Sequence, residues 1–91
     1  MRYKLEIKPE VSDYLRGLQL TREGRIRLHA ALNDAADFAD LFRTDSANRA
    51  GPFFFFRNIF RDGGRLRMLF LAVDDSPAAY GVLSVVYAEL Y

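Results

Sequence analysis

The chain has 91 residues, of which 51% are hydrophobic and 14% aromatic, and its 13 basic and 12 acidic side chains give a formal net charge of +1. These values are typical of one domain with an apolar core, and they exclude a disordered chain. The chain has no cysteine, which excludes disulfides, thiolate metal sites and a cysteine nucleophile. The opening MRYKLEIKPE has the pattern of neither a signal peptide nor a membrane span, so we expect a cytoplasmic protein.

The first predicted element is a strand over residues 2–8, where polar and apolar side chains alternate. Tyr3, Leu5 and Ile7 share one side of this strand, so that side is expected to face the core. Pro9 suits the first turn of a helix, because proline lacks the N–H that the first turn leaves unpaired. A short helix is therefore expected directly after the strand.

A second and longer helix is expected from the N-cap Thr21 to about Arg43. Apolar side chains recur along it at steps of three and four, which predicts one buried stripe. The two helices are expected to form a hairpin, followed by a loop over residues 44–52. The predicted stripe consists of Leu28, Leu32, Ala35, Ala39 and Phe42.

The rest of the chain predicts three antiparallel strands at about residues 53–61, 65–73 and 80–89, with turns at 62–64 and 74–77. The expected fold is α+β, in the order β-α-α-β-β-β. An antiparallel sheet would carry the two-helix hairpin on one face, in a single domain that spans residues 1–91.

The central hairpin decides which side chains share a face, because a slip of one residue turns every side chain over. A three-residue loop over 62–64 would place Arg57 opposite Leu69. A two-residue loop of Asp62 and Gly63 would instead bury Arg57 among apolar groups, at a cost of several kcal/mol. We therefore expect the three-residue loop. The side that faces the helices would then hold Phe54, Phe56, Asn58, Phe60, Leu66, Met68, Phe70 and Ala72, and the other side Arg57, Arg61, Arg65 and Arg67, with Phe53, Phe55 and Leu69.

The four arginines on the outer side are a candidate anion-binding cluster. In this register Arg61 lies directly opposite Arg65, a repulsive pair that lowers stability and that a phosphate would relieve. The alternative is that they are ordinary solvated arginines on an exposed hairpin. Because the net charge is nearly neutral, a nucleic-acid role rests on where the arginines lie.

Other chemistry-bearing residues have simpler explanations. His29 is expected on the surface of the long helix. Asp34, Asp37 and Asp40 recur at steps of three, so they point in successively different directions around the helix axis and do not converge as metal ligands would. We expect no metal site and no cofactor. The apolar tail VLSVVYAELY predicts a surface that is covered within the fold, by a partner or by a second copy of the chain in a homo-oligomer.

The element order and hydrophobic pattern resemble the RelE/ParE superfamily of bacterial toxin–antitoxin toxins. The resemblance spans YKLEIKPEVSDYLRGL, TREGRIRLHAALNDAADFADLF and RDGGRLRMLFLAVDDSPAAYGVLSVVY. Members often carry a basic residue two or three positions before an aromatic in the middle strand of the meander. The stretch from Arg67 to Phe70 is similar, with phenylalanine in place of the more usual tyrosine.

The resemblance implies a toxin that inhibits translation by cleaving ribosome-bound mRNA, and a cognate antitoxin as its partner. The implied reaction is attack of a ribose 2′-OH on the adjacent phosphodiester. The C-terminal strand has Ala88 and Glu89 where family ribonucleases usually carry a basic residue or a His-Tyr pair, so the general acid and base stay unassigned. The implied catalytic residues are Arg57, Arg61 and Arg67, and the implied substrate contacts are Arg65, Phe55 and Tyr87.

Two alternatives stay open within this fold. One is a ParE-like toxin that inhibits DNA gyrase by binding it, without hydrolytic activity. The other is an interaction module that kept the fold and has no toxin activity. The unassigned acid and base favour the first alternative, and the near-neutral charge favours the second.

Overall fold

A computed structural model of the chain describes residues 3–43, 46–74 and 81–91. As the sequence predicts, a short strand comes first, the helices follow it, and the long strands come last. They are β1 (Lys4–Ile7), α1 (Pro9–Arg16), α2 (Arg22–Asp37), α3 (Ala39–Arg43), a 3-10 turn (Ser46–Asn48), β2 (Arg49–Ala50), β3 (Phe53–Asp62), β4 (Arg65–Asp74) and β5 (Val82–Leu90).

The strands form one five-stranded sheet in the order β1-β5-β4-β3-β2. The expected α+β fold class is confirmed, but the expectation of an antiparallel sheet is wrong, because β1 pairs in parallel with β5. Alternation of side chains identifies a strand without specifying the direction of its neighbour. A parallel pair needs a long connection between its two strands. Here the connecting chain from β1 to β5 contains all the helices and the β3–β4 hairpin.

The long helix begins as expected, since the Thr21 hydroxyl accepts a hydrogen bond from the Gly24 N–H at 3.0 Å. It ends earlier than expected. Phe38 leaves the helical conformation, with φ −110° and ψ 16°, and a separate helix begins at Ala39. The sequence has neither glycine nor proline at this point to signal the break. Four members of the predicted stripe, Leu28, Leu32, Ala35 and Ala39, are buried.

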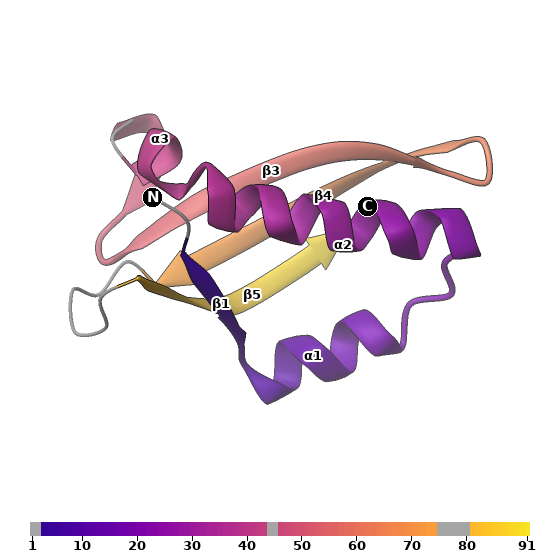
Figure 1. Ribbon diagram of the computed structural model, residues 1–91, viewed down its shortest axis with the longest axis horizontal. Coiled ribbons are helices and arrows are strands. Elements are labelled where there is room, and N and C mark those ends of the chain that lie inside the picture. Colours follow the sequence, from indigo (N-terminus) through magenta and orange to yellow (C-terminus); the bar gives the residue numbers. More distant parts are fainter. Residues whose placement is uncertain (1–2, 44–45, 75–80) are drawn as a thin grey trace.

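The helices lie on one side of the sheet, with α2 running across the long strands and α1 beside β5 (Figure 1). The core fills the space between these two layers, and β1 contributes Tyr3, Leu5 and Ile7 to its margin as expected. Its most deeply buried side chains from the sheet are Phe54, Phe56, Leu69, Leu71, Val73, Leu83 and Val85.

The predicted register of the central hairpin is wrong by one residue. Gly63 and Gly64 both adopt left-handed backbone, with φ of 57° and 84°, and they form a two-residue turn between Asp62 and Arg65. Two-residue turns with positive φ at both positions match the natural twist of a hairpin. As a result, Arg57 lies opposite Phe70 instead of Leu69.

This register turns β4 over relative to the prediction. Leu69, expected outward, is fully buried, while Leu66, Met68 and Phe70 lie on the side away from the helices. Ala72 also lies on that side. The four predicted arginines are therefore split, because Arg57 and Arg61 point away from the helices, and Arg65 and Arg67 share the helix side with Asp62.

The side chain of Asp62 makes this arrangement stable. Its carboxylate accepts hydrogen bonds from the Thr21 N–H at 3.0 Å and from the Thr21 hydroxyl, so the hairpin tip is tied to the start of α2. Arg67 Nε lies 3.7 Å from Asp62 Oδ2. The carboxylate and the partial exposure of the Arg67 side chain, 27%, offset part of the cost of placing an arginine on the helix side, while Arg67 Nε itself is buried without a hydrogen bond.

We expect Gly24→Ala to destabilise the fold by about 1–3 kcal/mol, the usual cost of overpacking. A Cβ at this position would lie 2.2 Å from Asp62 Oδ1, so the contact between Asp62 and Thr21 would have to break. Gly17→Ala is the matched control. A Cβ there would meet its nearest atom at 3.4 Å, and its backbone is right-handed, with φ −76°. Chemical denaturation measures the stability of both variants. Equal stability of the two would contradict the role of the Asp62–Thr21 contact in holding the hairpin tip to α2.

Candidate functional site

The face of the sheet that carries no helix, called the open face from here on, displays side chains from three neighbouring strands. Phe55 and Arg57 come from β3, Phe70 from β4 and Tyr87 from β5. The register sets Arg57 opposite Phe70, and both Phe55 and Tyr87 opposite Ala72. The small side chain of Ala72 leaves room for the rings around it.

These side chains form a compact cluster around Phe70. The Phe55 ring stacks on the Phe70 ring, with centroids 5.0 Å apart and planes inclined by 25°. The Tyr87 ring meets Phe70 edge-on at 6.4 Å. The guanidinium carbon of Arg57 lies 5.7 Å from the Phe70 centroid, within the range of a cation–π contact. We call Phe55, Arg57, Phe70 and Tyr87 the aromatic cluster.

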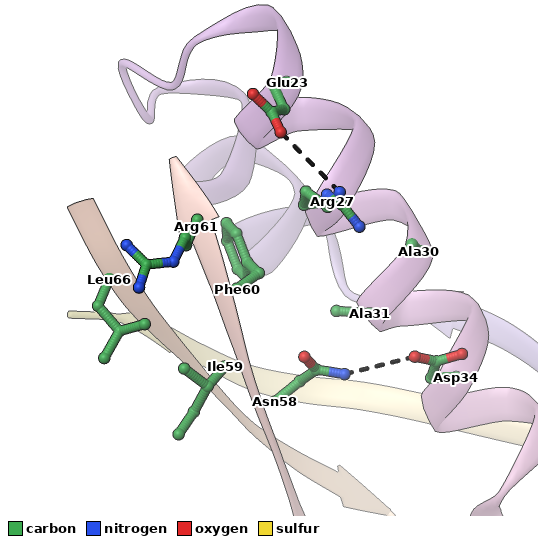
Figure 2. Close-up of a pocket in the computed structure, with 10 residues that line it drawn as sticks. All are labelled: Glu23, Arg27, Ala30, Ala31, Asp34, Asn58, Ile59, Phe60, Arg61 and Leu66. Carbon is green, nitrogen blue, oxygen red and sulfur yellow. Dashed lines mark hydrogen bonds and ion pairs between the residues drawn. The ribbon is translucent and has the colours of Figure 1, made fainter. Parts of the chain in front are cut away.

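Arg61 extends the cationic character of the open face toward the hairpin tip. Figure 2 shows Arg61 and Ile59 pointing to the opposite side of β3 from Phe60 and Asn58, which point toward α2. Both Arg57 and Arg61 are exposed. In the part of the chain that the structure describes, neither guanidinium is paired with a carboxylate. Two cations are thus available to an external anion.

A groove of about 440 Å³ lies between α2 and β3 (Figure 2). Its polar side chains are largely engaged with one another. Asn58 donates to Asp34 Oδ2 at 3.4 Å, and Arg27 lies 3.9 Å from Glu23. Arg61 is the remaining cation that lines this groove, and it also belongs to the open face, where Arg57 and the aromatic rings lie, so we place the candidate site on the open face.

Four of the six candidate site residues share the open face, namely Phe55, Arg57, Arg61 and Tyr87. Arg65 and Arg67 do not, and the expectation of one outward cluster of four arginines is wrong. Arg67 shares the helix side with Asp62 and forms an ion pair with it. Arg65, exposed directly after the turn, lies on the same side. The physical reason is the two-residue turn, which reverses the facing of every β4 side chain.

Sequence reasoning placed Leu66, Met68 and Phe70 on the helix side and gave Glu89 no role, although all four lie on the open face. Phe70 was expected among the helix-facing residues, because the predicted β3–β4 register pairs Arg57 with Leu69 and the observed register pairs it with Phe70. Glu89 was noted as a departure from the family pattern, without a role. In the sheet it lies directly opposite Phe70, on the β5 side.

Glu89 raises the pKa of the neighbouring tyrosine. The Tyr87 hydroxyl donates to Glu89 Oε2 at 2.9 Å, and this hydrogen bond, aided by burial, raises the pKa of Tyr87 above its ordinary value. A phenol that stays protonated donates a hydrogen bond but is a weak base. The open face therefore offers stacking surfaces, two cations and a protonated phenol beside a carboxylate.

The other expectations from the sequence have mixed outcomes. His29 is exposed, as expected. Asp34 and Asp40 are engaged by Asn58 and by the Tyr3 hydroxyl. Within the described residues there is no group of three or more metal-binding side chains, and no helix there is long and apolar enough to cross a membrane. The expected turn at 74–77 lies, after its first residue, outside the described residues.

Comparison of the chain with family models, curated protein sequences and solved structures found no match.

We expect stability to fall with acid in a way that depends on Asp62. The Thr21 hydroxyl, which donates to the Asp62 carboxylate, lowers the pKa of that carboxyl below its ordinary value of 3.8, against the opposing effect of burial. A lowered pKa in the folded state adds stability that is fully present above the unfolded pKa and is lost as the pH falls through the folded one. Thermal melts from pH 7 to pH 2 should therefore show a steeper loss below about pH 4 than melts of Asp62→Asn.

Asp13→Asn is the control for this experiment, because Asp13 is an exposed carboxyl on α1. The variant should follow the acid profile of the unmodified protein. Parallel profiles for the unmodified protein and Asp62→Asn would show that the Asp62 carboxylate does not stabilise the fold.

Proposed function

We propose that this protein is the toxin component of a bacterial toxin–antitoxin system and that it acts on single-stranded RNA, in the form of ribosome-bound mRNA, through the open face. The observation that supports this most is the cluster around Phe70, where a stacked ring and a guanidinium flank one half-buried aromatic side chain. The resemblance to the RelE/ParE superfamily supplies the toxin class, the antitoxin as partner and the cytoplasm as location.

The physical case begins with what single-stranded RNA needs from a protein. Unpaired bases stack on aromatic side chains and on arginine, and cationic side chains track the phosphates. Phe55, Phe70 and Tyr87 supply aromatic surface on three adjacent strands. Arg57 and Arg61 lie four residues apart on β3, about 13 Å along an extended strand, so they are placed to contact different phosphates.

For the cleavage that the resemblance implies, Arg57 and Arg61 would stabilise the charge that develops on the phosphate as the 2′-oxygen attacks. Arg67 is not assigned this role, because it is engaged with Asp62 on the helix side. An arginine stays protonated and is a poor general base. The proton-transfer groups of this reaction therefore stay unassigned.

A second candidate function, ParE-like inhibition of DNA gyrase by binding, is favoured by a different observation. Ile59 and Leu66 on the open face are 61% and 66% exposed, and large exposed apolar side chains are typical of surfaces that bind proteins. Glu89 also places a negative charge opposite Phe70, where an RNA phosphate would be repelled. An interaction module without toxin activity would use the same surface.

Induced expression in a bacterial host should arrest growth, and the double variant Arg57→Ala/Arg61→Ala should relieve the arrest. The matched control is Arg22→Ala/Arg25→Ala, which removes two exposed arginines from α2, away from the open face. Primer extension on cellular mRNA would show new cleavage ends under the proposed function, whereas gyrase inhibition would change plasmid supercoiling. No growth arrest by the unmodified protein would contradict both toxin functions.

Phe55→Leu should weaken binding of a single-stranded RNA 12-mer by about 1–3 kcal/mol, the usual contribution of one stacked base. Leucine keeps much of the apolar contact with Phe70 and removes the ring face. Phe38→Leu is the control, since Phe38 is a 52% exposed aromatic after α2. Fluorescence anisotropy at fixed salt measures all three proteins, and equal affinities would argue against RNA binding at the aromatic cluster.

A further inference from the structure

A second concave surface lies between β5 and α1. This groove, of about 380 Å³, is formed by Glu10, Val11 and Tyr14 of α1 and by residues 86–89 of β5. We call it the α1–β5 groove. Its walls are apolar, since Val11 and Ala88 belong to the edge of the core, while its rim carries two carboxylates.

The carboxylate of Glu89 is surrounded by tyrosine side chains. The Tyr87 hydroxyl donates to it at 2.9 Å, and a hydrogen bond to the same carboxylate raises the pKa of Tyr91. The Tyr14 hydroxyl accepts a hydrogen bond from the Leu90 N–H at 3.1 Å, which fixes Tyr14 against the strand. The rings stay accessible, because Tyr14, Tyr87 and Tyr91 are 40%, 48% and 56% exposed.

Neither carboxylate of the groove has a cation beside it. Over the described ranges, no lysine, arginine or histidine forms an ion pair with Glu10 or Glu89. The hydroxyls that bind Glu89 are uncharged and do not neutralise it. Two negative charges are thus held beside exposed aromatic rings and an apolar wall.

This combination is complementary to a long basic side chain. A guanidinium or ammonium group is attracted both by a carboxylate and by the face of an aromatic ring. The alkyl stem of arginine or lysine packs well on apolar surface while its charged head meets the polar rim. In the α1–β5 groove the stem would lie along Val11, Val86 and Ala88, and the head would meet Glu10 and Glu89.

We propose that the α1–β5 groove binds a protein partner through an arginine or lysine that follows apolar residues in the partner's chain. A free small cation would leave the apolar wall uncovered, and a nucleic acid would place its phosphates against Glu10 and Glu89. A protein segment uses both the wall and the rim. This inference does not depend on the proposed RNA function, since it rests on the groove between α1 and β5 and shares only Tyr87 and Glu89 with the open face.

The proposal predicts a charge pattern in the partner as well. The open face is cationic over β3, through Arg57 and Arg61, and the neighbouring α1–β5 groove is anionic, through Glu10 and Glu89. A partner that covers both regions would carry acidic residues toward β3 and a basic residue toward α1. Such an arrangement fixes orientation and steers association more than it raises affinity.

The experiment is an NMR titration of the ¹⁵N-labelled full chain with the blocked peptide acetyl-Leu-Val-Arg-Leu-amide. Its counterpart has glutamine in place of arginine. The arginine peptide should shift the amide signals of residues 86–89 and 10–14 in a saturable way, and the glutamine peptide should bind at least about threefold more weakly, as loss of a partly exposed ion pair implies. Glu89→Gln should weaken the arginine peptide by about three- to tenfold, and Glu10→Gln by a smaller factor.

Glu23→Gln is the matched control, because Glu23 is an exposed carboxylate on α2, outside the groove. It should leave the affinity unchanged. Retention of the tyrosine and amide spectrum in each variant shows that the fold persists. Raising the salt concentration should weaken the arginine peptide more than the glutamine peptide.

Several results would overturn the proposal. One is equal affinity for the two peptides, and another is unchanged affinity in both Glu89→Gln and Glu10→Gln. Binding of arginine amide alone as tightly as the peptide would identify a small-cation site instead. A single-stranded RNA that shifts the same groove residues in preference to the peptide would assign the groove to nucleic acid. Since the titration involves neither RNA nor growth, its failure leaves the proposed function to be judged by its own experiments.

Discussion

The facing of the sheet depends on the two-residue turn at Gly63 and Gly64 and on the carboxylate that precedes it. Both glycines occupy left-handed backbone, which sets Asp62 opposite Arg65 and fixes the parity of every residue along β3 and β4. The Asp62 carboxylate then binds Thr21 and attracts Arg67. One polar junction thus joins the hairpin tip to the first turn of α2 and makes a cation tolerable on the helix side.

The register of β3 and β4 also determines which side chains lie on the open face. It receives Phe55, Arg57 and Arg61 from β3 and Phe70 from β4, while the neighbouring strand β5 adds Tyr87 and Glu89. The surface is therefore neither a purely cationic patch nor a purely apolar one. Cations gather toward β3, tyrosines and carboxylates toward α1, and an aromatic cluster lies between them. Such a surface combines stacking with charge complementarity, which suits recognition of a macromolecule better than of a small ligand.

Local patterns in the sequence were sufficient for most elements. Alternation predicted β1, the threonine cap predicted the start of α2, and the stripe of Leu28, Leu32, Ala35 and Ala39 predicted its buried side. The end of α2 at Asp37 was missed, because no glycine or proline marks it. The parallel pairing of β1 with β5 was missed because a strand pattern does not contain the direction of its neighbour.

The register was missed for a physical reason that sequence patterns rarely contain. A two-residue loop of Asp62 and Gly63 was rejected because it would bury Arg57, but the observed turn of Gly63 and Gly64 is a third possibility that keeps Arg57 outward. In this register Arg67 moves to the helix side instead, beside Asp62, which is held in place by Thr21, 41 residues away in the chain. The candidate site was consequently half right. The odd-numbered residues of β3 were on the predicted side, while the residues of β4 exchanged faces.

The most direct test of the account is the pairing of β3 with β4, measured by cross-strand nuclear Overhauser effects between backbone Hα protons. Residues that face each other without mutual hydrogen bonds have Cα atoms only about 4.5 Å apart, so their Hα protons give strong signals. The account predicts such signals between Arg57 and Phe70 and between Ile59 and Met68. Strong signals between Arg57 and Leu69 instead would return Arg67 to the outer side and contradict the open face described for this protein.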